Sequence, residues 1–293
     1  MRVFIFKIFM GFFAKLPLSW VHRCGSGLAW LMMKQKGRLF KVTQRNVLTC
    51  FPELSEQEQQ QFIADSMRET AKTITEMGPM WWWSTDRLCK TIVKVTGRDV
   101  LQRAYDQGRG VIIAAPHLGA WELVGLYCAR FFPMTSLYKP PRHAEINEIV
   151  LHARERTGSS LVPTDNNGVK ALLKALKKGE MIGILPDQEP KNGTGIFAPF
   201  MTQPAYTMTL LSRFVKKTQA KVIFSFAQRL ENGAGFHLHF IEAGDDIASS
   251  DLDTSVATMN KGVERCISHC PTQYQWSYKR FRLQPQDSEQ DSA

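Results

Sequence analysis

A histidine and a carboxylate stand close together in a stretch of the chain whose surroundings favour catalysis. The apolar run from Gly110 to Ala115 predicts a short buried strand, and His117 follows it. The next run, from Leu118 to Phe132, has the apolar spacing of a helix and contains Glu122. His117 is therefore expected at the carboxyl end of a strand, where ligands collect in open α/β sheets and a helix start favours developing negative charge.

The chemistry that this pair suggests is general base catalysis. An imidazole can take a proton from a hydroxyl, and a neighbouring carboxylate supports its orientation and its cationic form. On one continuous helix their spacing would turn the two side chains roughly 140° apart, so His117 must precede the helix and Glu122 must lie in its first turns. The alternative is structural: His117 ends a strand and Glu122 complements the helix dipole. Spacing alone does not decide between them.

The chain alternates between strand and helix patterns, which predicts an α/β fold with a mixed central sheet flanked by helices. Strands are expected at residues 91–96, 110–115, 135–138, 160–162, 181–185, 221–228 and 236–241. Helices are expected at residues 55–77, 99–107, 118–132, 145–156, 167–178, 206–216 and 252–268. Ser55 and Glu58 have capping-box spacing at the start of the first helix, and Gly78-Pro79 is expected to stop it. Glu231-Asn232-Gly233 predicts a hairpin turn between the last two strands.

Several blocks of the chain follow one another in the order seen in a single enzyme family. They lie at residues 117–122, 154–158, 171–180, 185–188 and 275–281. Together these blocks resemble the late acyltransferases of bacterial lipid A biosynthesis, the lauroyl and myristoyl transferases of the lysophospholipid acyltransferase superfamily, over roughly residues 1–283. Glycerolipid acyltransferases of that superfamily typically carry aspartate where this chain has Glu122, which favours the lipid A branch.

The resemblance implies an enzyme that moves a fatty acyl group from acyl carrier protein to a hydroxyl of a phosphorylated lipid A precursor. His117 would act as the general base and Glu122 would stabilise the imidazolium, with no cofactor, no metal and no acyl-enzyme. Arg154 and Arg156 match the arginine-glycine block of the family and would bind acceptor phosphates. Asp187 follows a predicted strand into the same crevice, where it would order the site or bind a hydroxyl.

These assignments have structural alternatives. Arg154 and Arg156 are also compatible with two solvated charges near a helix end, and an aspartate after Pro186 is a common turn-former.

The backbone N–H groups of residues 118–120 are candidates for stabilising the oxyanion. Further candidates for contacts with phosphate or carrier protein are Lys139, Arg142 and the pair Lys279-Arg280.

Two segments depart from the commonest family pattern and bear on the acceptor. Tyr138-Lys139-Pro140-Pro141 stands where many relatives place an arginine-proline pair, and Ser277-Tyr278 replaces more hydrophobic or histidine-bearing residues. Alternative acceptors are a lysophospholipid, a glycolipid or an ornithine lipid. The alternative from another class is a catalytically silent membrane-binding protein. Neither departure affects the expected base and its carboxylate.

The basic charge of the chain is concentrated near its start. The first acidic residue is Glu53, whereas residues 1–52 hold nine lysines and arginines, and the net charge is +10. Removing these nine from the 37 basic residues leaves 28 against 27 acidic ones, so the remainder is nearly neutral. The same segment is strongly apolar, and anionic headgroups attract each nearby Lys or Arg with roughly 1 kcal/mol. The segment is therefore expected to be helical and membrane-associated.

Charges limit how that segment can sit in a membrane. Lys7, Lys15, Pro17 and Arg23 interrupt every window long enough to span, which favours an anchor embedded in one leaflet or a short tilted span, while a full span stays open. A cleaved signal peptide is the competing interpretation, but no small-residue cleavage pattern follows. Nucleic acid is disfavoured because the basic residues are interleaved with Phe, Leu, Trp and Met.

These patterns divide the chain into three parts. Residues 1–50 are expected to form the membrane anchor or interfacial region, residues 51–283 the acyltransferase domain, and residues 284–293 a disordered tail. Together with the resemblance, they imply a location on the cytoplasmic face of the bacterial inner membrane. The six cysteines show no disulfide framework, which is typical of a reducing compartment.

Three smaller motifs have competing interpretations. Trp81-Trp82-Trp83 is typical of a membrane interface or of a cluster that caps the core. The group Cys266, His269 and Cys270 suggests zinc but lacks a fourth ligand. His237 and His239 alternate on a strand and would share a face, where exposed or hydrogen-bonded histidines are commoner than a ligand pair.

Overall fold

The computed structural model describes residues 2–141, 143–191 and 193–283. Its centre is a sheet of seven strands in the order β1-β9-β8-β2-β5-β3-β4. Neighbouring strands run parallel except for the antiparallel pair β8–β9. The strands are β1 Ile92–Thr96, β2 Val111–Ala114, β3 Met134–Tyr138, β4 Ser159–Pro163, β5 Met181–Ile184, β8 Lys221–Arg229 and β9 Phe236–Glu242. The predicted mixed sheet is confirmed.

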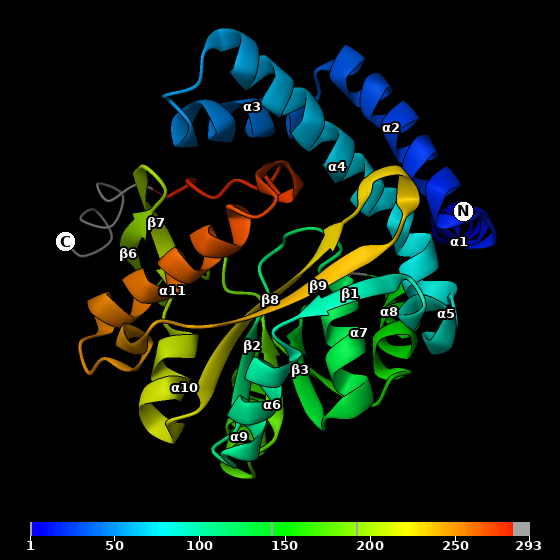
Figure 1. Cartoon of the computed structure of the whole chain (residues 1–293). Coiled ribbons are helices and arrows are strands. Elements are labelled where there is room, and N and C mark those ends of the chain that lie inside the picture. Colours follow the sequence, from blue (N-terminus) through cyan, green and yellow to red (C-terminus); the bar gives the residue numbers. More distant parts are fainter. Residues whose placement is uncertain (1, 142, 192, 284–293) are drawn as a thin grey trace.

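Helices cover both faces of this sheet (Figure 1). In the central strand β2, Val111 and Ile113 pack into a core with α6 and α7, while Ile112 and Ala114 pack into a second core with α9, α10 and α11. Such burial on both faces explains why β2 has an uninterrupted apolar sequence. The helices are α6 Arg98–Asp106, α7 Glu122–Phe131, α8 Ala144–Glu155, α9 Asn166–Lys177, α10 Leu210–Thr218 and α11 Leu252–Ile267.

Most predicted elements are confirmed to within a few residues, but the helix expected at 206–216 is partly wrong. Residues up to Met208 belong instead to a second, two-stranded sheet made by β6 (Gly195–Phe200) and β7 (Gln203–Met208). The physical reason is tertiary: Arg280, far along the chain, donates a hydrogen bond of 2.7 Å to the carbonyl oxygen of Tyr206. The helix then begins after this strand, at Leu210.

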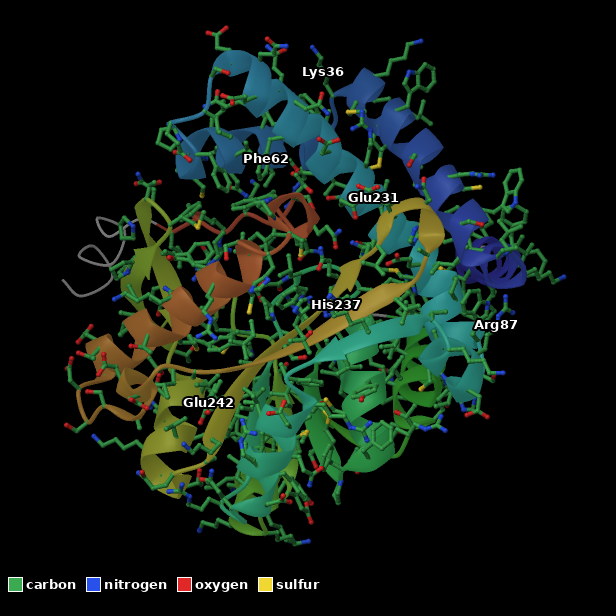
Figure 2. All side chains as sticks on the ribbon, viewed as in Figure 1. Lys36, Phe62, Arg87, Glu231, His237 and Glu242 are labelled. Carbon is green, nitrogen blue, oxygen red and sulfur yellow. The ribbon has the colours of Figure 1, made fainter. Side chains whose placement is uncertain are left out.

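Four helices form a layer across one end of the molecule, and the β8–β9 hairpin reaches it (Figure 1). They are α1 Arg2–Lys15, α2 Leu18–Gln35, α3 Arg38–Cys50 and α4 Glu56–Trp82, and the short α5 Thr85–Cys89 follows. The hairpin turn closely approaches α2, because a Cβ at Gly233 would come within 2.4 Å of the Cα of Ser19. Glu231 marks this turn in Figure 2. The division of the chain at residue 50 stays a prediction.

The start of α4 agrees with the sequence and its end does not. Ser55 and Glu58 form the expected capping box. The helix does not stop before Gly78-Pro79 but continues to Trp82, with Pro79 inside it. At Gly78, α1 crosses so closely that a Cβ would lie 2.5 Å from the carbonyl oxygen of Met10. Packing against α1 therefore accompanies the extra turn that the sequence pattern excluded.

The three tryptophans at the end of α4 take three different environments. Trp83 is buried and its Nε1 donates a 2.6 Å hydrogen bond to the carbonyl oxygen of Ala14. Trp82 is 40% exposed, and Trp81 lies against Phe6 of α1 with ring centroids 6.0 Å apart. One ring of the triplet is therefore in the core, as one interpretation expected, and another is partly exposed, while contact with a membrane interface stays a prediction.

The first two helices leave large apolar side chains uncovered. On α2, Arg23 stacks over exposed Trp20 and Lys34 over exposed Trp30. Within the described ranges, no helix combines the length and the apolar character that crossing a membrane would require. The exposed apolar side chains of these helices are Phe4, Ile5, Ile8, Phe9, Phe12, Trp20, Trp30 and Leu31.

Three histidine rings gather where β9 meets the end of α11. His237 and His239 share a face as expected, with ring centroids 3.8 Å apart, and His269 lies 5.2 Å from His239. His237 is labelled on β9 in Figure 2. Burial, together with the neighbouring His237, His269 and Lys94, lowers the pKa of His239 to about 4. His239 is therefore neutral in the fold at neutral pH.

This cluster should destabilise the fold in mild acid. The folded pKa of His239 lies below its ordinary value of 6.5, so its contribution is fully present above that pH and is lost as pH falls from 6.5 towards 4. We expect the free energy of unfolding to drop by about 1 kcal/mol more between pH 7 and 5 in the wild type than in His239→Gln, measured by urea denaturation. The exposed His152→Gln is the control. Equal losses in all three proteins would contradict this role of His239.

Candidate active site

His117 lies where the sequence placed it, just beyond the carboxyl end of β2. The β2–α7 loop (residues 115–121) carries it, and α7 begins only at Glu122 rather than at Leu118. The C-terminal segment holds this loop, because the N–H of Gln275 donates a 3.0 Å hydrogen bond to the carbonyl oxygen of His117. An isolated bridge also pairs Leu118 with Tyr274.

The carboxylate that contacts the imidazole belongs to Asp187, not to Glu122. Asp187 Oδ1 lies 2.9 Å from His117 Nδ1, and Asp187 Oδ2 accepts a 2.9 Å hydrogen bond from the backbone N–H of His117. Since β5 runs parallel to β2 and beside it, the residues that follow both strands meet at one edge of the sheet. Asp187 is only 2% exposed. The expected direct pairing of His117 with Glu122 is thus corrected.

Glu122 instead pairs with Arg154. Arg154 Nε donates a 2.9 Å hydrogen bond to one carboxylate oxygen of Glu122, and Nη2 donates to the other. This is the bidentate geometry that a guanidinium forms with a carboxylate. Burial alone would lower the pKa of Arg154, but the charge of Glu122 and its hydrogen bond raise it. Arg154 therefore stays cationic.

The contact with Asp187 selects the tautomer of His117. Burial alone would raise the pKa of the Asp187 carboxyl, but the imidazole and backbone N–H of His117 outweigh this effect and lower it. The carboxylate is thus ionised at neutral pH and only accepts hydrogen bonds, so Nδ1 carries a proton. Nε2 then presents a lone pair, and the side-chain amide of Gln188 lies 3.2 Å from it. This is the tautomer that a general base requires.

A cavity of about 560 Å³ lies beside the His117 side chain, which forms part of its wall. His117, Glu122 and Arg154 line its polar part, and Trp121 lies between them, 4.9 Å from the His117 ring and 5.7 Å from the Arg154 guanidinium. Much of the remaining wall is apolar. It includes Val124, Leu126, Met134, Leu161, Ile184 and Leu210. An imidazole, an ion pair and several apolar side chains therefore line one cavity.

Of the two expected phosphate ligands, the structure brings only Arg154 to the cavity wall. The Arg156 guanidinium turns away and donates hydrogen bonds to the carbonyl oxygens of Met80 and Ala153. It therefore ties the end of α8 to α4. This placement answers which arginine of the pair points inward.

The other basic residues expected to contact phosphate or carrier protein also differ in whether they reach the cavity. Lys139 lines the cavity and Lys279 is exposed. Arg280 is buried and donates 2.7 Å hydrogen bonds to the carbonyl oxygen of Tyr206 and to the hydroxyl of Thr207, which makes it a core residue. Arg142 lies outside the described residues.

The backbone donors expected for an oxyanion are already used. The N–H groups of Leu118, Gly119 and Ala120 donate to the carbonyl oxygens of residues 116, 273 and 227 respectively. These bonds fix the β2–α7 loop against its neighbours instead of pointing into the cavity. The expectation for residues 118–120 was therefore wrong, because it assumed that this stretch begins a helix.

Sequence reasoning missed two contributors near the imidazole. Gln188 bridges His117 and Gln275, with 3.2 Å from its Nε2 to Gln275 Oε1. Burial and then the charge and hydrogen bond of Asp187 raise the pKa of Tyr274 well above its ordinary range. The only signal for Gln188 was its place next to Asp187, and no local pattern singled out Tyr274.

Comparison with known proteins agrees with the resemblance seen in the sequence. A family model described as bacterial lipid A biosynthesis acyltransferase matches residues 1–283. The lipid A biosynthesis lauroyltransferase of Escherichia coli (strain K12) is 29% identical over 273 residues, which cover 93% of this chain and 88% of the relative. The palmitoleoyltransferase of the same organism is 30% identical over 295 residues, which cover 92% and 93%. This chain therefore belongs to the bacterial lipid A biosynthesis acyltransferase family.

Proposed function

We propose that this protein transfers a fatty acyl group from the thioester of acyl carrier protein to a hydroxyl of a phosphorylated lipid A precursor. The observation that carries the proposal is His117, whose Nδ1 contacts buried Asp187 and whose side chain lines a cavity with many apolar side chains. Membership of the family supports the reaction class. The donor, the acceptor and the residue roles are our inference.

In the proposed reaction His117 first accepts a proton from the acceptor hydroxyl and later donates it to the leaving thiolate. Nε2 takes the proton of the acceptor hydroxyl as its oxygen attacks the thioester carbonyl, and Asp187 stabilises the imidazolium. The tetrahedral intermediate then collapses, the new C–O ester bond remains, the C–S bond breaks, and the imidazolium returns its proton to the leaving thiolate. The Gln188 amide nitrogen lies 3.2 Å from both His117 Nε2 and Gln275 Oε1; once the acceptor hydroxyl takes the place beside Nε2, the N–H freed from Nε2 is the proposed donor to the oxyanion.

The Glu122–Arg154 pair is proposed to bind the acceptor. Arg154 contributes a guanidinium that faces the cavity, and Lys139 contributes a second cation to the same cavity. Both are suited to phosphate oxygens, and Glu122 holds the Arg154 fork in a fixed orientation. In this proposal Glu122 acts through Arg154 and does not touch the imidazole.

The N-terminal helices are proposed to attach the protein to the cytoplasmic face of the inner membrane. Exposed apolar side chains on α1 and α2 lie next to basic ones, as in the stacking of Arg23 on Trp20. A basic amphipathic surface of this kind lies in the headgroup region with its apolar side chains buried in one leaflet. Such attachment would bring the cavity to a lipid acceptor.

The proposal is tested with purified full-length protein, radiolabelled acyl carrier protein thioester and vesicles that contain an anionic lipid and a lipid A precursor. We expect transfer of label to the precursor, and sedimentation of the protein with the anionic vesicles but not with neutral ones. Label on a lysophospholipid, glycolipid or ornithine lipid offered in parallel, with none on the precursor, would contradict the proposed acceptor.

Gly125 should control which acyl chains fit the cavity. It lies on α7 three residues after Glu122, lines the cavity, and a Cβ there would meet no described atom within 4 Å. A larger side chain would therefore enter the cavity. In Gly125→Leu we expect the kcat/KM ratio of long to short acyl donors to fall at least about tenfold, since each methylene in an apolar pocket is worth roughly 10- to 200-fold.

The matched control is Gly27→Leu on α2. Gly27 also has open space around its Cβ position but does not line the cavity. In Gly27→Leu the kcat/KM ratio of long to short acyl donors should stay at the wild-type value. An unchanged ratio in Gly125→Leu would mean that the acyl chain occupies a different part of the molecule.

A further inference from the structure

One buried arginine joins the β2–α7 loop to the N-terminal helices. Arg229 ends β8 and is 4% exposed. Its Nε donates a 2.7 Å hydrogen bond to Glu76, and its Nη2 donates 2.7 Å and 3.0 Å hydrogen bonds to Thr73 Oγ1 and to the carbonyl oxygen of Gly119. A 3.3 Å ion pair with Glu69 engages Nη1. One guanidinium thus contacts α4 and the β2–α7 loop together.

The contact at Gly119 fixes the part of the loop next to His117. Gly119 has a φ of +60°, and a Cβ there would lie 2.1 Å from the carbonyl oxygen of Ala227. Its N–H donates to the carbonyl oxygen of Gln273, whose side chain bonds both the N–H and the carbonyl oxygen of Arg229 at 2.8 and 3.0 Å. The peptide two residues beyond the imidazole is therefore held from both sides.

Two cations face the two carboxylates of this cluster, since Arg229 pairs with Glu76 and Glu69 and Lys72 also pairs with Glu69. Burial alone would raise the pKa of Glu76, but Arg229 and His22 lower it to about 2, so the carboxylate is ionised. His22 Nε2 of α2 lies 2.7 Å from Glu76 Oε1. Removing one partner of such a buried, hydrogen-bonded cluster would leave the remaining charge buried without compensation, which is strongly destabilising. The arrangement is therefore expected to be rigid.

We infer that Arg229 is a positioning residue for catalysis: it holds the Gly119 carbonyl, and through it the β2–α7 loop, so that His117 meets Asp187 and the cavity. Its catalytic consequence rests on the proposed function. Arg229 is absent from the residues that line the cavity and acts through the loop. The N-terminal helices thereby support the site in addition to any part in membrane binding.

Arg229→Lys tests this role in the full-length protein. Lysine keeps a positive charge beside Glu76 but lacks the planar fork that reaches Thr73 and Gly119 at the same time. We expect kcat to fall at least about tenfold, because small displacements of catalytic groups are costly, while KM for the acyl donor stays within about threefold of wild type. We also expect the NMR signals of the His117 ring, assigned through their loss in His117→Gln, to shift in the absence of substrate.

Asn260→Ala is the matched control. Asn260 is 1% exposed and also donates to a carbonyl oxygen and a threonine hydroxyl, those of Pro199 and Thr207, between α11 and the β6–β7 sheet. It should lose a similar amount of thermal stability while kcat stays within about twofold and the His117 signals stay in place. If Arg229→Lys does not fold, Thr73→Val removes one partner of the guanidinium and should shift the same signals, with kcat lowered at least about threefold.

Wild-type kcat and unmoved His117 signals in the folded Arg229 variant, or in Thr73→Val, would overturn the inference. Equal effects in Asn260→Ala would also overturn it, since general destabilisation would then explain them. The NMR measurement needs no acyl transfer. If the wild type transfers no acyl group but the His117 signals still shift in Arg229→Lys, the proposed function would be contradicted while the structural effect of Arg229 on His117 would be supported.

Discussion

His117→Ala is expected to lower kcat for acyl transfer at least about 100-fold, because the loss of a general base typically costs 10²- to 10⁴-fold in rate. The imidazole lines the cavity and is held at Nδ1 by Asp187, so its removal takes away the proposed proton acceptor and leaves substrate binding largely intact. KM for the acyl donor should therefore change little. Steady-state kinetics on the purified variant, with its melting temperature as a folding check, provide the measurement.

His152→Ala is the control for His117→Ala, since His152 is exposed on α8 and absent from the cavity lining. It should retain wild-type kcat. A His117→Ala protein that is folded and keeps more than a tenth of wild-type kcat would remove the imidazole from the proposed mechanism.

Asp187→Asn is expected to be nearly as damaging, and more so than Glu122→Gln. Asparagine keeps the size of the side chain but loses the charge that stabilises the imidazolium and selects the tautomer with the proton on Nδ1. We expect kcat to fall about 100-fold or more in Asp187→Asn. Glu122→Gln should mainly weaken the Arg154 pair and raise KM for the acceptor about tenfold, with a smaller effect on kcat.

Comparing these two variants decides which carboxylate serves the base. Both replacements are close to isosteric, and both original side chains line or adjoin the same cavity. A larger kcat loss in Glu122→Gln than in Asp187→Asn would show that the carboxylate paired with Arg154, not the one that contacts His117, supports catalysis.

Local patterns predicted most of the fold because the decisive signals were local. The alternation of apolar runs gave the strands of the main sheet, and the Glu231-Asn232-Gly233 turn predicted the β8–β9 hairpin. The predictions failed where contacts with residues far along the chain determine the local secondary structure. Pro79 remains helical beside α1, and residues up to Met208 form a strand that Arg280 contacts from the far end of the chain.

Several residues of the site were predicted, but the contacts between them were not. His117 and Asp187 were both expected at carboxyl ends of strands, yet the sequence does not state that β2 and β5 are neighbours. Nearness in sequence therefore favoured Glu122 as the partner of His117. Arg229 and Gln273 escaped notice for the same reason, because their contacts with the β2–α7 loop join residues more than a hundred positions apart.

In the proposed mechanism the Asp187-oriented imidazole of His117 is the general base for acylation of a lipid A precursor. Mass spectrometry of lipid A from a strain without this gene tests it most directly, with plasmid copies of the wild type and of His117→Ala for comparison. We predict lipid A one acyl chain short in the deletion strain, restored by the wild type and not by His117→Ala. An unchanged number of acyl chains in the deletion strain, or restoration by His117→Ala, would contradict the claim.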